Sequence, residues 1–221
     1  MHAIHTTPGL IIDSRPYGEA GKMLSIFTRD LGLVMAAAQG IRLEKSKLRY
    51  HVQNHSFGMY SLVRGKELWR LTSASGQEEY SSSKKSSEPR RRRETGAASA
   101  DADAGFENRT IPPAAELVAR ISLLLRRLLQ GEEPHPELFD IVHSCLGFAS
   151  RSPDLTDEQI RSIESLAVLR MLHVLGYIGK EPQFADCLAS SEMTADLIAK
   201  ASTARILINK HINKALKESH L

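Results

Sequence analysis

The sequence predicts an α+β protein in which a small β-barrel is followed by a domain of helices. Two observations predict this fold class. Between residues 9 and 72, short apolar, β-branched or aromatic runs alternate with glycine-containing turns, which is typical of antiparallel strands. After residue 112, the apolar residues recur with the three-and-four spacing of amphipathic helices.

The first part is expected to contain five strands, at residues 9–15, 22–28, 33–39, 56–63 and 68–72. The link from Arg29 to Gly32 is a short hairpin loop in which the glycine takes the left-handed conformation, and residues 64–67 serve the same purpose before the last strand. Five short strands in about 65 residues predict a five-stranded barrel of the OB type. We place this domain at residues 1–73.

The second part is expected to be helical over residues 112–221. Its first helix carries an apolar stripe and ends at Gly131, and its second places Cys145 within the stripe, so Cys145 is expected in the core. A capping box formed by Thr156 and Gln159 opens the third helix. The last helix spans roughly residues 194–217.

Residues 74–111 differ from both parts because they contain hardly any apolar side chains. Such a segment cannot bury enough surface to offset the entropy of ordering it, so we expect a disordered Ser/Arg-rich linker or insert. Its arginine run at 90–93 either contacts DNA phosphates or is only solvated, and composition leaves both open.

Charge is distributed unevenly along the chain, although the net charge is only +3. Residues 1–73 carry ten Lys and Arg against five Asp and Glu, whereas residues 112–221 carry twelve against fourteen. An excess of positive charge confined to the first domain indicates a polyanionic partner for that domain.

Positive charge is densest just after the third expected strand. Arg42, Lys45, Lys47 and Arg49 stand within eight residues and are followed by Tyr50. Cations on a loop can follow a sugar-phosphate backbone, and an aromatic ring stacks on bases of any sequence. The alternative is an exposed loop whose charges only aid solubility.

Several function classes find no support in the sequence. It contains no phosphate-binding glycine loop, nucleophile elbow or paired-histidine zinc motif, so we expect no catalytic residues and no enzyme. Two cysteines, Cys145 and Cys187, are too few for a disulfide framework or a four-cysteine zinc site, so we expect neither metal nor cofactor. No apolar run is long enough to span a membrane, and a cytoplasmic protein is expected.

Specific motifs resemble the RecO family of recombination mediators. The stretch from Ser14 to Gly32, SRPYGEAGKMLSIFTRDLG, is similar to the family's opening motif, an S-R-x-Y/W-x-E pattern followed by an apolar strand and F-T-x-x-x-G. Further similarity lies in the basic loop beginning at Gly40, in the interhelical phrase at 132–139, and in the L-G-Y motif at 175–177 followed by Cys187. Many relatives carry a four-cysteine zinc module after that motif, and only Cys187 remains here.

The resemblance implies an OB-fold and a helical domain that together bind single- and double-stranded DNA and anneal complementary strands. It also implies contacts with RecR and with the acidic C-terminal tail of single-strand-binding protein, and an indirect role in loading RecA. A bacterial, nucleoid-associated location follows from the same resemblance. The alternative is an OB-fold RNA-binding or translation-associated adaptor with a helical docking domain.

Charge and helical spacing select candidate residues for two of these contacts. For DNA we select cations of the basic loop and of nearby strand ends, together with one tyrosine: Arg15, Lys22, Arg29, Arg42, Lys45, Lys47, Arg49 and Tyr50. For the acidic tail we select cations that flank the apolar face of the third helix or form a row on the last: Arg161, Arg170, Lys210, Lys214 and Lys217.

Overall fold

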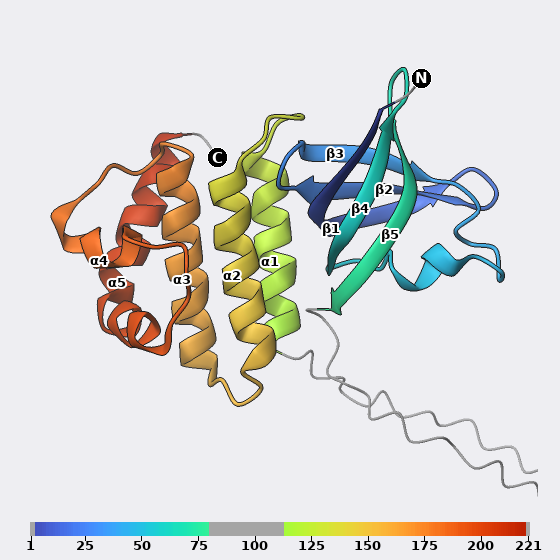
Figure 1. Ribbon diagram of the computed structural model, residues 1–221. Helices are drawn as coiled ribbons and strands as arrows, with labels where there is room; N and C mark the ends of the chain where they lie inside the picture. The colour runs from blue at the N-terminus through green and yellow to red at the C-terminus, as the bar shows by residue number, and fades with distance from the viewer. Residues whose placement is uncertain (1–2, 80–112, 220–221) are drawn as a thin grey trace, which may run out of the picture.

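The computed structural model describes residues 3–79 and 113–219. Its first part is a closed barrel of five strands in the order β1-β2-β3-β5-β4, and its second part is helical (Figure 1). This arrangement confirms the α+β fold class and the N-terminal OB-fold barrel. The strands are β1 Ile4–Tyr17, β2 Gly21–Thr28, β3 Gly32–Ala38, β4 Ser56–Arg64 and β5 Trp69–Glu79.

Alternation along the strands sorts side chains between the inside and the outside of the barrel. On β2, Leu24 and Ile26 point inward and are fully buried, whereas Phe27 points outward against the helices. Closure depends on pairs that are distant in sequence. Strand β1 pairs with β4, and β3 pairs in parallel with β5 through Ala36 and Ala37.

Two strands are longer than the sequence predicts. Strand β1 begins at Ile4 and continues to Tyr17, and a change of register between Ile11 and Asp13 lets it pair with both neighbours. Strand β5 continues to Glu79, so residues 74–79 belong to the barrel and not to the expected linker. The rest of that linker, including the arginine run at 90–93, lies outside the described residues.

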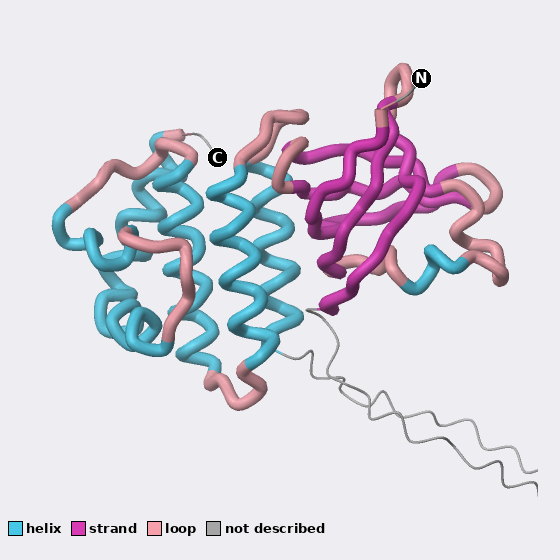
Figure 2. The backbone as a smooth tube through the Cα atoms, in the orientation of Figure 1, coloured by secondary structure: helices cyan, strands magenta, loops and turns pink. Residues whose placement is uncertain are grey.

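The helices stand side by side next to the barrel, as the tube drawing shows (Figure 2). Helix α1 contacts β1, and α3 packs against α1, α2 and α5. The capping box of α3 is present, because the Thr156 side chain accepts from the Gln159 backbone and the Gln159 side chain accepts from the Thr156 backbone. The helices are α1 Pro113–Leu128, α2 Pro136–Arg151, α3 Asp157–Val174, α4 Ala185–Leu188 and α5 Ala195–Glu218, with short 3-10 turns η1 Lys47–Tyr50 and η2 Pro182–Phe184.

The barrel and the helices share one apolar interface. Leu10, Ile12 and Phe27 belong to the same buried cluster as the helices, and the Phe139 ring of α2 lies 5.4 Å from the Phe27 ring. At the edge of this interface, Arg29 of the barrel donates two hydrogen bonds of 3.0 Å to the carboxylate of Asp140 in α2. None of the described helices is long and apolar enough to cross a membrane.

Candidate nucleic-acid interface

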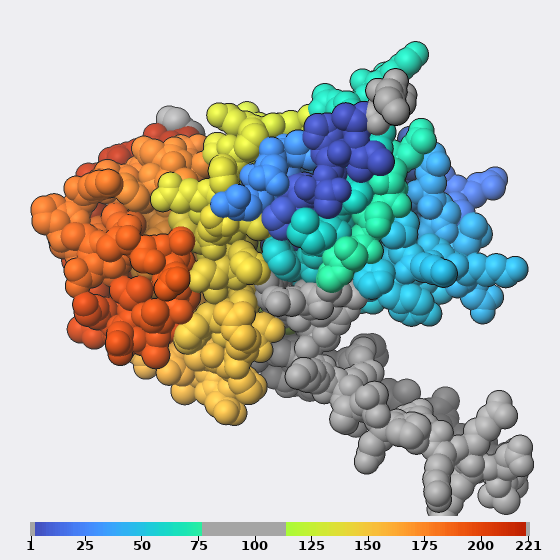
Figure 3. Space-filling view, viewed as in Figure 1, coloured from blue at the N-terminus to red at the C-terminus, as the bar shows by residue number. Residues whose placement is uncertain are grey.

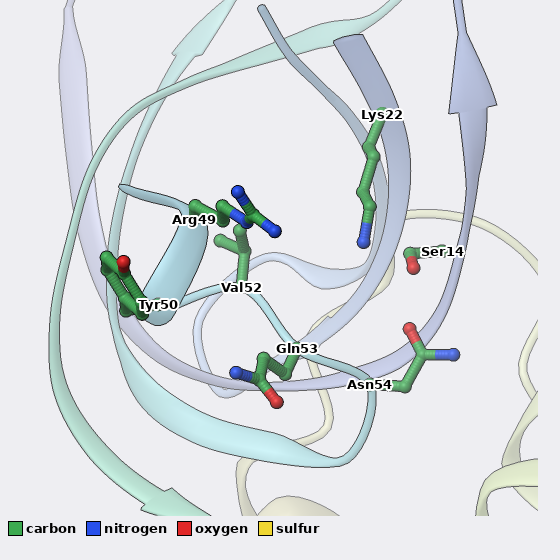
Figure 4. A pocket seen from close by; sticks show the side chains of 7 residues that line it. All are labelled: Ser14, Lys22, Arg49, Tyr50, Val52, Gln53 and Asn54. Carbon is green, nitrogen blue, oxygen red and sulfur yellow. The ribbon is translucent and has the colours of Figure 1, made fainter. Parts of the chain in front are cut away.

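One end of the barrel is hollowed and positively charged. A cavity of about 540 Å³ opens there between β1, β2 and the loop that joins β3 to β4 (Figure 4). A second cavity of about 260 Å³ adjoins it and shares Lys22, Arg49 and Val52 with the first. We call the two together the mouth cavity. Its other lining residues are Ser14, Tyr50, Gln53, Asn54, Ile41 and Arg42.

Strand geometry brings Lys22 into this cavity. Lys22 pairs with Ala38 and shares the inward face of β2 with Leu24 and Ile26. Since Lys22 is near the start of the strand, its side chain reaches the open end of the barrel, whereas Leu24 and Ile26 fill the closed interior. Figure 4 shows Lys22 and Arg49 extending toward the same space from β2 and η1.

The loop over residues 39–55 forms the other wall and is anchored along its length. Ile41 and Val52 are buried in the barrel core, at 2% and 1% exposure. The Arg42 backbone N–H donates to the Ala20 carbonyl at 2.9 Å, and that of His55 donates to the Ile11 carbonyl at 2.7 Å. The loop is therefore held against the barrel, and the turn η1 between its anchors has no buried residue.

Near the foot of the loop, His55 adopts a left-handed backbone conformation with φ of 66°. Burial lowers the pKa of the His55 imidazole below its ordinary value, and the nearby carboxylate of Asp13 opposes this shift. We therefore expect a neutral ring at pH 7, so His55 adds no charge to this end of the barrel.

The cations of the mouth cavity have no acidic partners among the residues that the structure describes. Lys22, Arg42 and Arg49 form no ion pair with any carboxylate in the part of the chain that the structure describes. Arg42 makes one long hydrogen bond, 3.4 Å, to the Glu19 carbonyl. Donors that face solvent without a carboxylate are free to bind an anionic ligand.

A second hollow lies between α3 and α5. It has a volume of about 490 Å³, and an apolar surface formed by Val168, Ile206 and Ile212 is bordered by Arg161 and Arg205. Ile206 is 87% exposed, which is unusual for an isoleucine. Glu164 is the one carboxylate among the described residues of the lining, and it accepts from Arg120 at 2.7 Å. We call this hollow the α3–α5 groove.

Arg170 does not border the α3–α5 groove, so this selection from the sequence is wrong. Its side chain is 2% exposed, and its guanidinium donates to the backbone carbonyls of Cys187 at 2.6 Å, Ser191 at 3.3 Å and Glu192 at 2.9 Å. Burial lowers the pKa of Arg170. Arg170 therefore holds the segment before α5 in place and is not available to a partner.

Neither cysteine belongs to a cluster with metal-ligand composition in the described ranges. Among residues 3–79 and 113–219, no three His, Cys, Asp or Glu side chains lie together as a metal site. Both thiols are free and buried, and burial raises the pKa of Cys145 to about 12. Cys145 is thus in the core, as its position in the apolar stripe predicts.

Comparison with known proteins agrees with the fold and the motifs. Residues 1–80 match the family described as recombination protein O N terminal. A DNA repair protein RecO of Desulfitobacterium hafniense (strain DSM 10664 / DCB-2) is 28% identical over 185 residues, which is 83% of this chain and 56% of that protein. The DNA repair protein RecO of Gloeothece citriformis is 26% identical over 201 residues, 87% of this chain and 57% of that protein. The barrel thus matches the N-terminal family of recombination protein O, and the chain as a whole is similar to proteins named DNA repair protein RecO.

Sequence identity to relatives is higher in shorter alignments of about 70 residues. The DNA repair protein RecO of Clostridium novyi is 38% identical over 69 residues, which is 31% of this chain and 27% of that protein. The chain spans a little over half the length of the first two relatives.

The residues selected for DNA fall into three groups in the structure. Lys22, Arg42, Arg49 and Tyr50 meet at the mouth cavity, and Lys45 and Lys47 are exposed on the same loop. Figure 3 shows this loop projecting from the barrel on the side away from the helices. The other two selections lie elsewhere, because Arg15 pairs with Met23 on the outward face and Arg29 is engaged by Asp140.

For the tail site, only Arg161 borders the α3–α5 groove. Lys210, Lys214 and Lys217 are exposed on α5 outside its lining, and Lys214 approaches Glu218 at 3.9 Å. Arg205 borders the groove and was not selected, because one arginine on a long amphipathic helix gives no sign of what it faces. The sequence also did not reveal Ser14, Gln53 and Asn54 of the mouth cavity, because closure of the barrel brings them together.

Proposed function

We propose that the barrel binds single-stranded nucleic acid at the mouth cavity and the loop beside it, and that the protein acts in this way in DNA repair and recombination. One observation carries the proposal: Lys22, Arg42 and Arg49 converge on a hollow whose lining, among the described residues, includes no carboxylate. The relatives named DNA repair protein RecO support DNA as the polymer.

Binding of this kind needs no bond to be made or broken. Lysine and arginine neutralise phosphates and release their counterions, which is favourable for any base sequence. Tyr50 is 64% exposed and lies at the rim, where its ring stacks on a base and contributes roughly 1–3 kcal/mol. Lys45 and Lys47 extend the charged surface along the loop.

The finer role that we propose is that of a non-enzymatic mediator. Charge neutralisation on two strands, with their bases left accessible, favours annealing of complementary DNA, and the same surface binds duplex DNA. RecR and single-strand-binding protein are the proposed partners, and RecA loading follows from displacement of the latter. This work takes place in the bacterial cytoplasm on nucleoid DNA.

The experiment that tests this function removes the charges of the loop. Replacing Lys45, Lys47 and Arg49 together with alanine should weaken binding to every single-stranded sequence. It should also flatten the plot of log affinity against log salt by about 0.7 for each phosphate that the protein no longer neutralises. The matched control replaces Lys210, Lys214 and Lys217, which removes the same charge from α5 at the other end of the molecule.

Annealing of complementary oligonucleotides coated with single-strand-binding protein supplies the second readout. The wild-type protein should accelerate annealing, and the loop variant should lose most of the acceleration. The α5 control should keep it on oligonucleotides without single-strand-binding protein, because its lysines are not assigned to DNA. An unchanged salt slope in the loop variant contradicts the assigned surface. Binding to RNA without any acceleration of DNA annealing favours an RNA-binding adaptor instead.

The α3–α5 groove is our proposed dock for the acidic tail of single-strand-binding protein. Its apolar surface accepts an aromatic side chain at the end of such a tail, while Arg161 and Arg205 pair with the terminal carboxylate and with preceding aspartates. The lysine row of α5, Lys210, Lys214 and Lys217, lies on the same helix as Arg205 and attracts the tail within a Debye length of about 8 Å at physiological salt.

Titration with a fluorescent tail peptide tests the dock. The double variant Arg161→Ala, Arg205→Ala should bind the peptide about tenfold or more weakly, because it lacks both groups that form charge-assisted hydrogen bonds with the tail. The lysine triple variant should be weakened less and mainly at low salt. Equal affinity of all three proteins, or no effect of deleting the peptide's terminal aromatic residue, would place the dock elsewhere.

A further inference from the structure

The mouth cavity contains uncharged polar side chains as well as cations. Binding to the phosphates of a continuous strand requires only the cations. Lys22 and Arg49 lie on the boundary between its two parts, since both parts include them, and Arg42 belongs to the smaller part alone. The larger part is completed by the hydroxyl of Ser14 and the amides of Gln53 and Asn54. Cations gather in one region and groups that both donate and accept hydrogen bonds in another.

These two regions match the two ends of one nucleotide. The amides of Gln53 and Asn54 can pair with the edge of a base. The phosphate then lies toward Lys22 and Arg49, which extend into the same space (Figure 4). A volume of about 540 Å³ falls within the range of small-ligand sites, about 300–1,000 Å³.

Charge distinguishes a strand end from its interior. An internal phosphodiester carries one negative charge, whereas a terminal phosphomonoester has a second pKa near 6, carries about −1.5 to −2 at pH 7 and offers three terminal oxygens. In the described part of the chain, the lining of the mouth cavity presents three cations and no carboxylate. A diester leaves about two of these positive charges without a counter-charge, whereas a monoester leaves only about one.

We propose that the mouth cavity receives the terminal nucleotide of a strand, with its phosphomonoester held between Lys22, Arg42 and Arg49. The inference rests on the proposed binding of single-stranded nucleic acid by this surface. It adds that the strand end is anchored in the cavity, while Lys45 and Lys47 hold the backbone that leads away from it. The barrel thereby binds a phosphorylated end in preference to the middle of a strand.

The test compares three oligonucleotides of one sequence, carrying a 5′-phosphate, a 3′-phosphate or hydroxyls at both ends, at pH 7.5. We expect one of the two phosphorylated forms to bind about tenfold more tightly than the hydroxyl form, and the identity of that form gives the polarity of binding. The variants Lys22→Met and Arg49→Gln should each reduce this ratio toward one. Lys66→Met, which removes an exposed charge from the link between β4 and β5, should leave the ratio unchanged.

Each outcome bears on a separate statement. Equal affinity for all three oligonucleotides overturns end recognition, and the proposed function still stands if the loop variant flattens the salt dependence. A preference for the phosphate that survives both Lys22→Met and Arg49→Gln also overturns the assignment, because the end is then bound elsewhere. Absence of salt-dependent binding to any of the oligonucleotides contradicts the proposed function itself. Circular dichroism of each variant verifies that it is folded.

Discussion

Replacing Arg170 with methionine should lower the free energy of unfolding by about 3–5 kcal/mol, whereas Arg161→Met on the same helix should change it by less than about 0.5 kcal/mol. Both substitutions remove one positive charge from α3 and keep an unbranched side chain. They differ in burial, because Arg170 is 2% exposed and Arg161 is exposed. Chemical denaturation followed by circular dichroism measures both.

The large effect at Arg170 comes from the carbonyl groups that its guanidinium satisfies. Cys187, Ser191 and Glu192 offer these carbonyls from the segment around the end of α4, which has few regular backbone hydrogen bonds of its own. Methionine fills the space but donates nothing, and each buried carbonyl left without a donor costs about 1–3 kcal/mol. Arg170→Lys should restore little, since one ammonium group cannot reproduce the planar fork.

A local readout separates this role from a general loss of packing. Cys187 is buried at 6% exposure, and its thiol should react faster with an alkylating reagent in Arg170→Met if the segment loosens. Cys145, at 0% exposure inside α2, is the internal comparison and should remain slow under native conditions. Unchanged stability together with an unchanged rate at Cys187 would show that water replaces the guanidinium without cost.

Arg170 also shows why part of the site could not be predicted from sequence. When only one side of a helix is apolar, the spacing of its apolar residues predicts that a cation between them faces solvent. Helix α3 does not fit this case, because α1, α2 and α5 cover it on more than one side. Ser162 and Ser165 are buried on the same helix, so polar residues do not mark its solvent side. The number of neighbours around a helix is a tertiary property, and the local pattern does not contain it.

The mouth cavity was predicted in part for a related reason. The four cations at residues 42–49 are close in sequence, so a charged loop was evident. These cations lie near Lys22 and Ser14 only because the barrel closes. Closure pairs β1 with β4 and β3 with β5, which are far apart in the sequence. The five strands and four of the helices were predictable because hydrophobic periodicity is local. The ends of the strands were not predictable. Pro8 and Pro16 each lack a backbone N–H and so predict a shorter β1 than the strand from Ile4 to Tyr17.

Gly32→Ala should destabilise the protein by about 3–5 kcal/mol, because this glycine meets two separate requirements. Its φ is 71°, in the left-handed region that costs another residue roughly 1–2 kcal/mol. An added Cβ would also lie 2.7 Å from the carbonyl carbon and 2.8 Å from the nitrogen of Glu133. Backbone atoms of the loop between α1 and α2 cannot move aside as a flexible side chain can.

Gly18→Ala is the control that isolates the second requirement. Gly18 has a φ of 63°, but nothing lies within 4 Å of an added Cβ there, so this substitution should cost only about 1–2 kcal/mol. The difference between the two variants measures the close approach of barrel and helices at Gly32. Equal destabilisation would mean that the loop at Glu133 moves freely, and that the close approach contributes nothing to stability.

Unfolding followed by one spectroscopic probe in the barrel and another in the helices tests whether the close approach at Gly32 couples the two halves. Trp69 is the single tryptophan and lies in the barrel core, whereas the signal at 222 nm comes mainly from the helices. In the wild-type protein the two transitions should coincide, because Leu10, Ile12 and Phe27 of the barrel share a core with the helices and Leu33 donates to the Gly131 carbonyl at 3.3 Å. In Gly32→Ala the clash forces β3 and the loop at Glu133 apart, so the fluorescence transition should separate from the helical one. Coincident transitions in that variant, at reduced stability, would instead show that the shared apolar core alone couples the two halves.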